Sequence, residues 1–122
     1  MRWSWAVAVL GLVAGARQTM AAGDPTAGEQ IFHKCAICHS PLKGTNKVGP
    51  SLFGIVGRKS ATIDTFTYSD AMKAANKTWD EATLNIYLTD PKALVPGTKM
   101  IFPGLKDDTD RANVIAYLAT LK

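Results

Sequence analysis

The sequence lacks alternating polar and apolar runs that are long enough to form β-strands. It also lacks internal repeats and low-complexity tracts, which excludes a repeat protein. Its 122 residues, 47% hydrophobic and 20% charged, have the size and composition of one globular domain. These observations predict an all-α fold with large loops.

The chain also lacks a strong excess of either charge. Its formal net charge of +4 includes Arg2 and Arg17, and without them 12 basic and 10 acidic side chains remain. So small an excess argues against nucleic-acid binding. Any electrostatic function must therefore depend on how the charges are distributed over the surface.

One long hydrophobic run is present, at the N-terminus. Arg2 precedes an uncharged stretch over residues 3–13, and small residues follow before position 23. A membrane span needs about 20 apolar residues, and Arg17 interrupts this run too early, so we expect no stable membrane insertion. We expect residues 1–22 to be a secretory signal peptide that is cleaved, and residues 23–122 to be a single domain.

Four segments carry the capping residues and apolar spacing of helices, namely residues 25–34, 68–76, 78–89 and a final segment opened by Asp107, Asp108 and Asp110. Thr78 and Glu81 have the spacing of a capping box for the third segment, which Pro91 ends. Pro96 and Pro103 are predicted to frame a short irregular strap. Residues 40–67 are rich in glycine, proline and small polar residues, and so long a loop is unusual unless a non-protein group gives it a packing surface.

The two cysteines occur in the segment Cys35-Ala36-Ile37-Cys38-His39, which has the spacing of a covalent haem attachment site. Each thiol can add to a vinyl group at one edge of the porphyrin, and the imidazole can bind the iron. A redox dithiol normally opens a helix after a strand, whereas this pair follows a predicted helix. A zinc site that includes His33 would crowd four ligands into seven residues, whereas Cys2His2 sites separate their ligand pairs by about a dozen. The residues alone do not exclude a plain disulfide between Cys35 and Cys38.

A methionine is the candidate for the sixth ligand of the iron, because a thioether suits an iron that cycles between Fe(II) and Fe(III). Met1 and Met20 lie in the predicted signal peptide. Met72 lies in a short predicted helix and is interpreted as a core gap-filler. Met100 lies in the proline-framed strap, so we expect His39 and Met100 to be the metal ligands. Iron held in this way has no open position, which indicates an electron carrier and no catalytic residues; a haem enzyme or gas sensor with a labile Met100 bond is the alternative.

A set of motifs follows one order along the chain: Cys35 to His39, Gly49 to Leu52, Gly57 to Lys59, Phe66 to Ala71, Trp79, Tyr87-Leu88, and Pro96 to Met100. This ordered set resembles class I cytochrome c of the mitochondrial and bacterial cytochrome c2 type. The resemblance covers nearly all of the chain after the N-terminal segment. It implies the cytochrome c fold, in which helices and long loops wrap round one covalently bound haem c.

The resemblance implies ten cofactor-binding residues: Cys35, Cys38, His39, Pro50, Arg58, Tyr68, Trp79, Tyr87, Thr98 and Met100. The Pro50 carbonyl would bond the second ring nitrogen of His39 and fix the tautomer of the ring. Met72 departs from the pattern, because many relatives have an asparagine at this position. This departure puts the usual hydrogen-bond network near the haem in doubt.

The remaining implied roles concern the sulfur ligand and the haem propionates. Tyr87 and Thr98 would lie near the ligand sulfur and tune it. Tyr68, Trp79 and Arg58 would bond or neutralise a buried propionate, which is costly to remove from water. For the aromatic residues, plain core packing is the alternative role.

The resemblance also implies a soluble, periplasmic, monomeric carrier. It would pass one electron between a quinol-oxidising complex or dehydrogenase and a terminal oxidase or photosynthetic reaction centre. Five lysines in segments next to haem-contacting residues predict transient electrostatic docking to acidic redox complexes: Lys34, Lys47, Lys92, Lys99 and Lys106. Lysines that serve only solubility are the alternative.

Overall fold

The computed structural model describes residues 11 and 23–122, and this part of the chain is all-α, as predicted. Its helices are α1 (Pro25–Phe32), α2 (Asp70–Ala75), α3 (Glu81–Thr89), α4 (Pro91–Leu94) and α5 (Asp108–Ala119). Strand pairing among the described residues is limited to an isolated bridge between Lys59 and Thr78. No helix of this part of the chain is long and apolar enough to cross a membrane. Apart from Gly11, the predicted signal peptide lies outside the described residues and stays a prediction.

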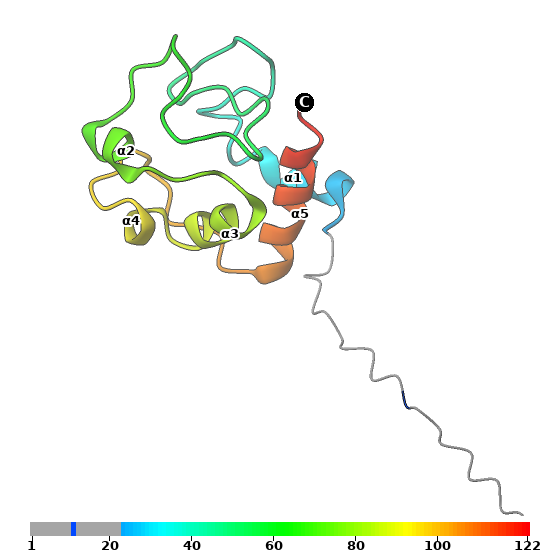
Figure 1. The fold of residues 1–122 in the computed structure, drawn as a ribbon. Helices are drawn as coiled ribbons and strands as arrows, with labels where there is room; N and C mark the ends of the chain where they lie inside the picture. The colour runs from blue at the N-terminus through cyan, green and yellow to red at the C-terminus, as the bar shows by residue number, and fades with distance from the viewer. Residues whose placement is uncertain (1–10, 12–22) are drawn as a thin grey trace, which may run out of the picture.

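Helices α1 and α5 come from opposite ends of the domain and pack against each other (Figure 1). Gly28 permits this approach, because a Cβ atom at this position would lie 1.9 Å from the carbonyl oxygen of Asn113. One turn later, the ring centroids of Phe32 and Tyr117 are 5.1 Å apart. The backbone N–H of Asp24 donates to the Asn113 side chain at 2.8 Å, which fixes the start of α1 on α5.

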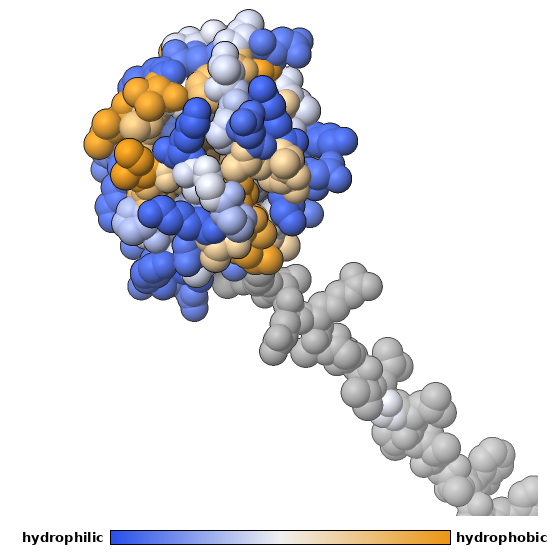
Figure 2. Space-filling model, turned by 90° about the vertical axis from the view of Figure 1, so that its left-hand side faces the viewer, coloured by the Kyte–Doolittle hydropathy of each residue, from blue (hydrophilic) through white to orange (hydrophobic). Residues whose placement is uncertain are grey.

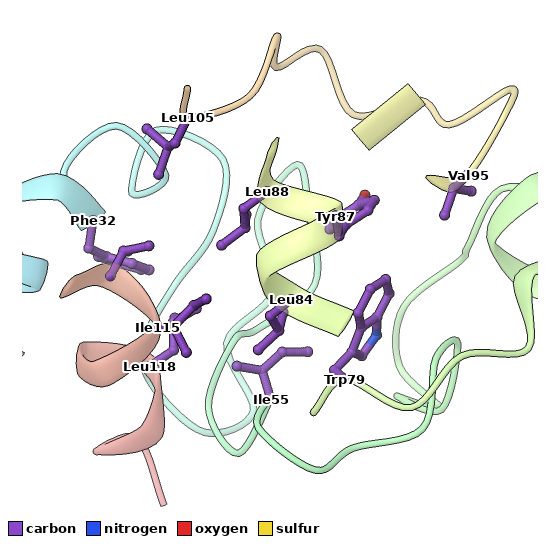
Figure 3. Packing of buried hydrophobic residues seen from close by; sticks show 11 residues of the cluster. Phe32, Ile55, Trp79, Leu84, Tyr87, Leu88, Val95, Leu105, Ile115 and Leu118 are labelled. Carbon is purple, nitrogen blue, oxygen red and sulfur yellow. The ribbon is translucent and has the colours of Figure 1, made fainter. Parts of the chain in front are cut away.

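Helix α3 connects this helix pair to the rest of the core (Figure 3). Leu84 and Leu88 point from α3 toward the α5 residues Ile115 and Leu118. Tyr87 lies on another side of α3, next to Trp79, with 4.8 Å between the ring centroids. One helix therefore contributes both to the aliphatic core and to the aromatic wall described below.

The start of α3 differs from the predicted capping box. Thr78 pairs with Lys59 in the isolated bridge, so it is not available as a cap. The cap is Asp80, whose carboxylate accepts a hydrogen bond of 2.7 Å from the Thr83 N–H. Pro91 follows the end of α3, as predicted, but it also begins α4, because proline is well suited to a first helical position. The strap predicted between Pro96 and Pro103 contains no helix, as expected. Helix α1 ends at Phe32 rather than at Lys34.

Residues 33–69 contain no α-helix, in agreement with the predicted long loop. Side chains supply hydrogen bonds that regular structure would otherwise provide. The buried Ser51 hydroxyl donates to the Leu42 carbonyl at 2.7 Å and accepts from the Phe53 N–H at 3.2 Å. Asn46 accepts from the Ser51 N–H at 3.0 Å and donates to the Thr65 hydroxyl at 3.0 Å. These bonds hold the two halves of the loop together.

Arg111 is a buried charged residue that the sequence patterns did not predict, with 6% of its surface exposed. Its Nε donates to the Asn85 side chain at 2.9 Å, its Nη1 donates to the Leu105 carbonyl at 2.7 Å, and its Nη2 pairs with Asp108. Arg111 thereby ties α5 to α3 and to the segment that follows the strap.

The close approach at Gly28 predicts that Gly28→Ala destabilises the domain. The added methyl group would overlap the Asn113 carbonyl, so the two helices would have to separate. We expect a loss of about 1–3 kcal/mol, the usual range for overpacking a well-packed contact, and a lower melting temperature in thermal unfolding. The control is Gln30→Ala on the exposed side of α1. Equal melting temperatures for the two variants would contradict the packing argument.

The Asp80 cap predicts a pH effect. Hydrogen bonds from Thr83 lower the pKa of the Asp80 carboxyl below its usual value. The charged cap therefore stabilises the fold above the unfolded-state pKa of about 4, and this contribution is lost as the pH falls through the lowered folded-state pKa. Asp80→Asn keeps a capping side chain without a charge. We expect it to melt below the wild type at neutral pH and to approach it in acid; a melting-temperature gap independent of pH would refute the charge effect.

Candidate functional site

A cavity of about 460 Å³ lies among α3, the long loop and the strap. This volume is in the range of pockets that bury a cofactor, about 300–1,000 Å³. The lining includes all ten residues predicted from the sequence: Cys35, Cys38, His39, Pro50, Arg58, Tyr68, Trp79, Tyr87, Thr98 and Met100. The fold thus brings together residues that are spread over more than half of the described chain.

The Cys35 to His39 segment continues directly from the end of α1 as a tight turn. The Cys38 and His39 N–H groups both donate to the Cys35 carbonyl, at 3.0 and 2.8 Å. Cys35 and Cys38 are not joined in a disulfide. Burial raises the pKa of the Cys35 thiol, and the charge of Lys34 opposes that rise. Among the residues that the structure describes, no group of three or more His, Cys, Asp or Glu side chains could hold a metal ion, and His33 is exposed.

The His39 ring is fixed by two neighbours. Its Nδ1 lies 2.7 Å from the Pro50 carbonyl oxygen. Gly49 lies against the ring, because a Cβ atom there would lie 2.3 Å from the ring Cε1. Burial lowers the pKa of His39, the Pro50 carbonyl opposes this, and the charges of Arg58 and Lys47 lower it further. A neutral ring that donates Nδ1–H to Pro50 keeps Nε2 as a free metal ligand.

Met100 and two hydroxyl side chains form a second group on the cavity wall. The Tyr87 hydroxyl donates to the Met100 Sδ at 3.7 Å. The Met100 N–H donates to the Thr98 hydroxyl at 3.3 Å. Burial raises the pKa of Tyr87, and a hydrogen bond with Thr98 opposes the rise. The thioether is therefore held by contacts from α3 and from its own strap.

A third group consists of hydrogen-bond donors. The Arg58 guanidinium donates to the Phe53 and Ser51 carbonyls at 3.1 and 3.0 Å, which fixes its position on the wall. Burial lowers the pKa of Arg58, and Tyr68 opposes this. The Tyr68 hydroxyl accepts from the Ile63 N–H at 3.2 Å, so its own proton is available to another acceptor. Trp79 adds an indole N–H to the same wall.

The chemistry of these three groups fits a haem. Two thiols three positions apart can form covalent thioether bonds, and an imidazole and a thioether are ligands of low-spin iron. The Arg58, Tyr68 and Trp79 donors can satisfy carboxylates that enter the cavity. The mainly apolar remainder of the lining suits the porphyrin faces.

The apolar floor of the cavity was only partly predictable. Leu84 and Leu88 are four residues apart on α3, a spacing that could have identified them as one buried face. Ile55 is buried within a glycine-rich loop, where no periodicity marks it. Met72, interpreted as a gap-filler, packs against the core and also lines the cavity.

Comparison with known proteins places the chain in one family. The sequence model of the cytochrome c family matches residues 25–122. Cytochrome c2 of Rhodomicrobium vannielii is 58% identical over 102 residues, which cover 82% of this chain and 81% of the relative. Cytochrome c2 of Rhodoblastus acidophilus is 53% identical over 102 residues, covering 83% and 95% of the two chains.

A solved structure agrees with this assignment. Cytochrome cH from Methylobacterium extorquens superposes with a TM-score of 0.76 at 47% identity, covering 80% of this chain and 99% of that one. The fold is therefore the cytochrome c fold, as the sequence motifs implied. By its motifs, its fold and its relatives, the chain belongs to the cytochrome c family.

Proposed function

We propose that this protein is a periplasmic electron carrier in which His39 and Met100 would hold the haem iron. The cytochrome c family carries covalently bound haem c, and Cys35 and Cys38 have the attachment spacing. Its members are electron-transfer proteins, not enzymes. When bound, the haem supplies an iron that cycles between Fe(III) and Fe(II) and so stores one electron. The observation that carries the proposal is that both side chains line one cavity and that each is held by a hydrogen bond.

The protein's task in this proposal is to keep both ligands in place in the two oxidation states. On one side, the Pro50 carbonyl and the Gly49 backbone leave the His39 ring little freedom to rotate. On the other side, the Tyr87 hydroxyl donates to the Met100 sulfur. With haem bound, this hydrogen bond would withdraw electron density from the ligating thioether and so would favour Fe(II). Little rearrangement is then needed when an electron enters or leaves.

The third group, the hydrogen-bond donors Arg58, Tyr68 and Trp79, has a different role. A propionate carboxylate inside the cavity would lose its hydration, so it needs hydrogen-bond donors or a counter-charge. Arg58 is positioned by two backbone carbonyls, and the Tyr68 hydroxyl has a proton to give. We assign these two residues, with the Trp79 indole, to the propionates.

The rim of the cavity supports transient docking of redox partners. Val48 and Ile101 line the cavity and are 80% and 99% exposed. Lys34 and Lys99 lie at the same rim. One face of the molecule shows such a mixture, with hydrophobic groups at the surface among hydrophilic ones (Figure 2). A small mixed surface of this kind suits a brief encounter with an acidic partner.

Two of the five proposed docking lysines are also used inside the fold. The Lys47 ammonium donates to the Ala36 carbonyl in the haem attachment segment. The Lys106 ammonium donates to the Thr89 carbonyl at 2.7 Å. Their charges are held at fixed places, so a change at either residue would alter structure as well as docking. Lys34 and Lys99 are therefore the better residues for a test of docking.

The predicted signal peptide supports export, and haem attachment to the two thiols is expected outside the cytoplasm. We propose a monomer that accepts an electron from a quinol-oxidising complex or dehydrogenase. It would pass the electron to a terminal oxidase or a photosynthetic reaction centre.

The axial role of Met100 is tested by Met100→Ala. Loss of the thioether should lower the reduction potential, abolish the thioether-to-iron band at the red end of the ferric spectrum, and allow carbon monoxide to bind at neutral pH. Peroxidase-like side activity should appear with the open position. Met72→Leu, which changes the other methionine of the cavity, is the control. An unchanged spectrum in Met100→Ala would show that the ligand lies elsewhere.

The docking role of the rim is tested through salt. Reaction with an acidic redox partner should slow as ionic strength rises, because salt screens the attraction. Lys99→Gln should reduce this salt dependence in stopped-flow kinetics. Lys122→Gln, at the exposed C-terminus and outside the cavity lining, should leave it unchanged. A rate that does not depend on salt would contradict the proposal that the charged rim attracts the partner.

A further inference from the structure

Lys47 is not among the residues that line the cavity, yet its ammonium group reaches the haem attachment segment. We infer that Lys47 is a positioning residue for His39. By bonding the Ala36 carbonyl, it keeps the turn that carries Pro50 in register with the attachment segment, so that the Pro50 carbonyl stays on the His39 ring. This inference rests on the proposed ligation of the iron by His39.

Four hydrogen bonds join residues 47–52 to residues 36–40, in the same order along both segments. The first in this order is the bond from the Lys47 ammonium to the Ala36 carbonyl. The other three use main-chain groups of residues 47–52: the Gly49 N–H donates to the Cys38 carbonyl at 2.8 Å, the Pro50 carbonyl oxygen lies 2.7 Å from His39 Nδ1, and the Leu52 N–H donates to the Ser40 carbonyl at 2.9 Å. A substitution at residue 47 therefore removes the first bond and leaves the main-chain groups of the other three in place.

The Ala36 carbonyl lies between the two cysteines and depends on Lys47 for its hydrogen bond. The nearby Cys38 and His39 N–H groups both donate to the Cys35 carbonyl instead. Outside the helices of the part of the chain that the structure describes, no backbone N–H donates to the Ala36 carbonyl. A charged donor forms a stronger hydrogen bond than a neutral one. Lys47 thus fixes a peptide group of the attachment segment itself.

The turn that carries Lys47 is stiffened by bonds of its own. The Asn46 side chain accepts from the Ser51 N–H at 3.0 Å, which joins the two ends of the turn. Inside the turn, the Lys47 N–H donates to the Gly49 carbonyl at 3.0 Å. A restraint at the Lys47 side chain is therefore transmitted along the turn.

The restraint ends at the His39 ring. Gly49 is buried, and a Cβ atom there would lie 2.3 Å from the ring Cε1 and 2.9 Å from the ring Nε2. One residue further, the Pro50 carbonyl oxygen lies 2.7 Å from the ring Nδ1. A shift of the turn would weaken this bond. Because such a bond raises the basicity of an imidazole ligand, and a more basic ligand favours Fe(III), the shift would also change the reduction potential.

Hydrogen exchange in the reduced holoprotein, followed by NMR, tests this role. Lys47→Met keeps an unbranched side chain but cannot donate. Exchange of the Gly49 N–H and of the His39 Nδ1–H should become about fivefold faster, the factor expected for the loss of one hydrogen bond of ordinary strength. Lys47→Arg can still donate and should keep the wild-type rates. Lys43→Met, at an exposed lysine of the same loop, should also leave them unchanged.

An internal reference separates a local effect from a general loss of stability. The Leu105 N–H donates to the Leu88 carbonyl at 2.7 Å, and its exchange rate should be the same in all of these proteins. Lys47→Gln guards against failure of Lys47→Met to fold and should give the same faster exchange at the two test sites. Equal acceleration at Leu105, or unchanged exchange at both test sites, would overturn the positioning role.

The reduction potential separates positioning from the charge of Lys47. In about 1 M salt the Debye length is about 3 Å, so the effect of an exposed charge such as that of Lys47 is largely screened. Under these conditions the potential of Lys47→Met should lie above that of the wild type, because a weaker bond to Pro50 makes the His39 ring less basic. A potential equal to or below that of the wild type would overturn the inference. Wild-type His39 ring protons without the upfield shift of a ring that faces a porphyrin would instead overturn the proposed ligation.

Discussion

The attachment of haem c through one short segment, Cys35 to His39, is the constraint on which the rest of the structure depends. Because this segment follows α1 without a break, the attachment point is fixed to the α1–α5 helix pair at its base. The long loop over residues 33–69 has no helix, and several of its side chains line the cofactor cavity. Contact with the cofactor can therefore order this loop without a second layer of helices packed against it. A domain of this size thus encloses a large cofactor with few helices.

The two sides of the cavity are held in different ways. His39 is fixed by backbone, through the Pro50 carbonyl and the close approach of Gly49. Met100 is held by side chains, and its strap is anchored further on, where the Leu105 N–H donates to the Leu88 carbonyl at 2.7 Å. The buried Arg111 bonds the Leu105 carbonyl and reinforces this anchor. In our account the His39 side would set the position of the iron, and the Met100 side would set how strongly the sulfur donates electron density to it.

The sequence predicted the cavity residues better than the helix ends. Cys-x-x-Cys-His spacing and the ordered motifs depend on local chemistry, and all ten residues proposed from them line one cavity. The acidic residues Asp107, Asp108 and Asp110 were expected to open the last helix for the same local reason, and Asp107 does cap it. The Thr78 cap failed because a distant residue, Lys59, pairs with that segment. Burial of Arg111 could not be predicted, since two of its acceptors, Asn85 on α3 and the Leu105 carbonyl, are brought to it only by the fold.

The central claim is that His39 and Met100 together leave the iron no open position. It is tested most directly by a redox titration of the purified holoprotein that is followed through the visible spectrum. The account predicts one reversible one-electron transition at a high potential, with the thioether band present throughout the ferric form. A ferric spectrum without that band, or iron that is five-coordinate at rest, would contradict it.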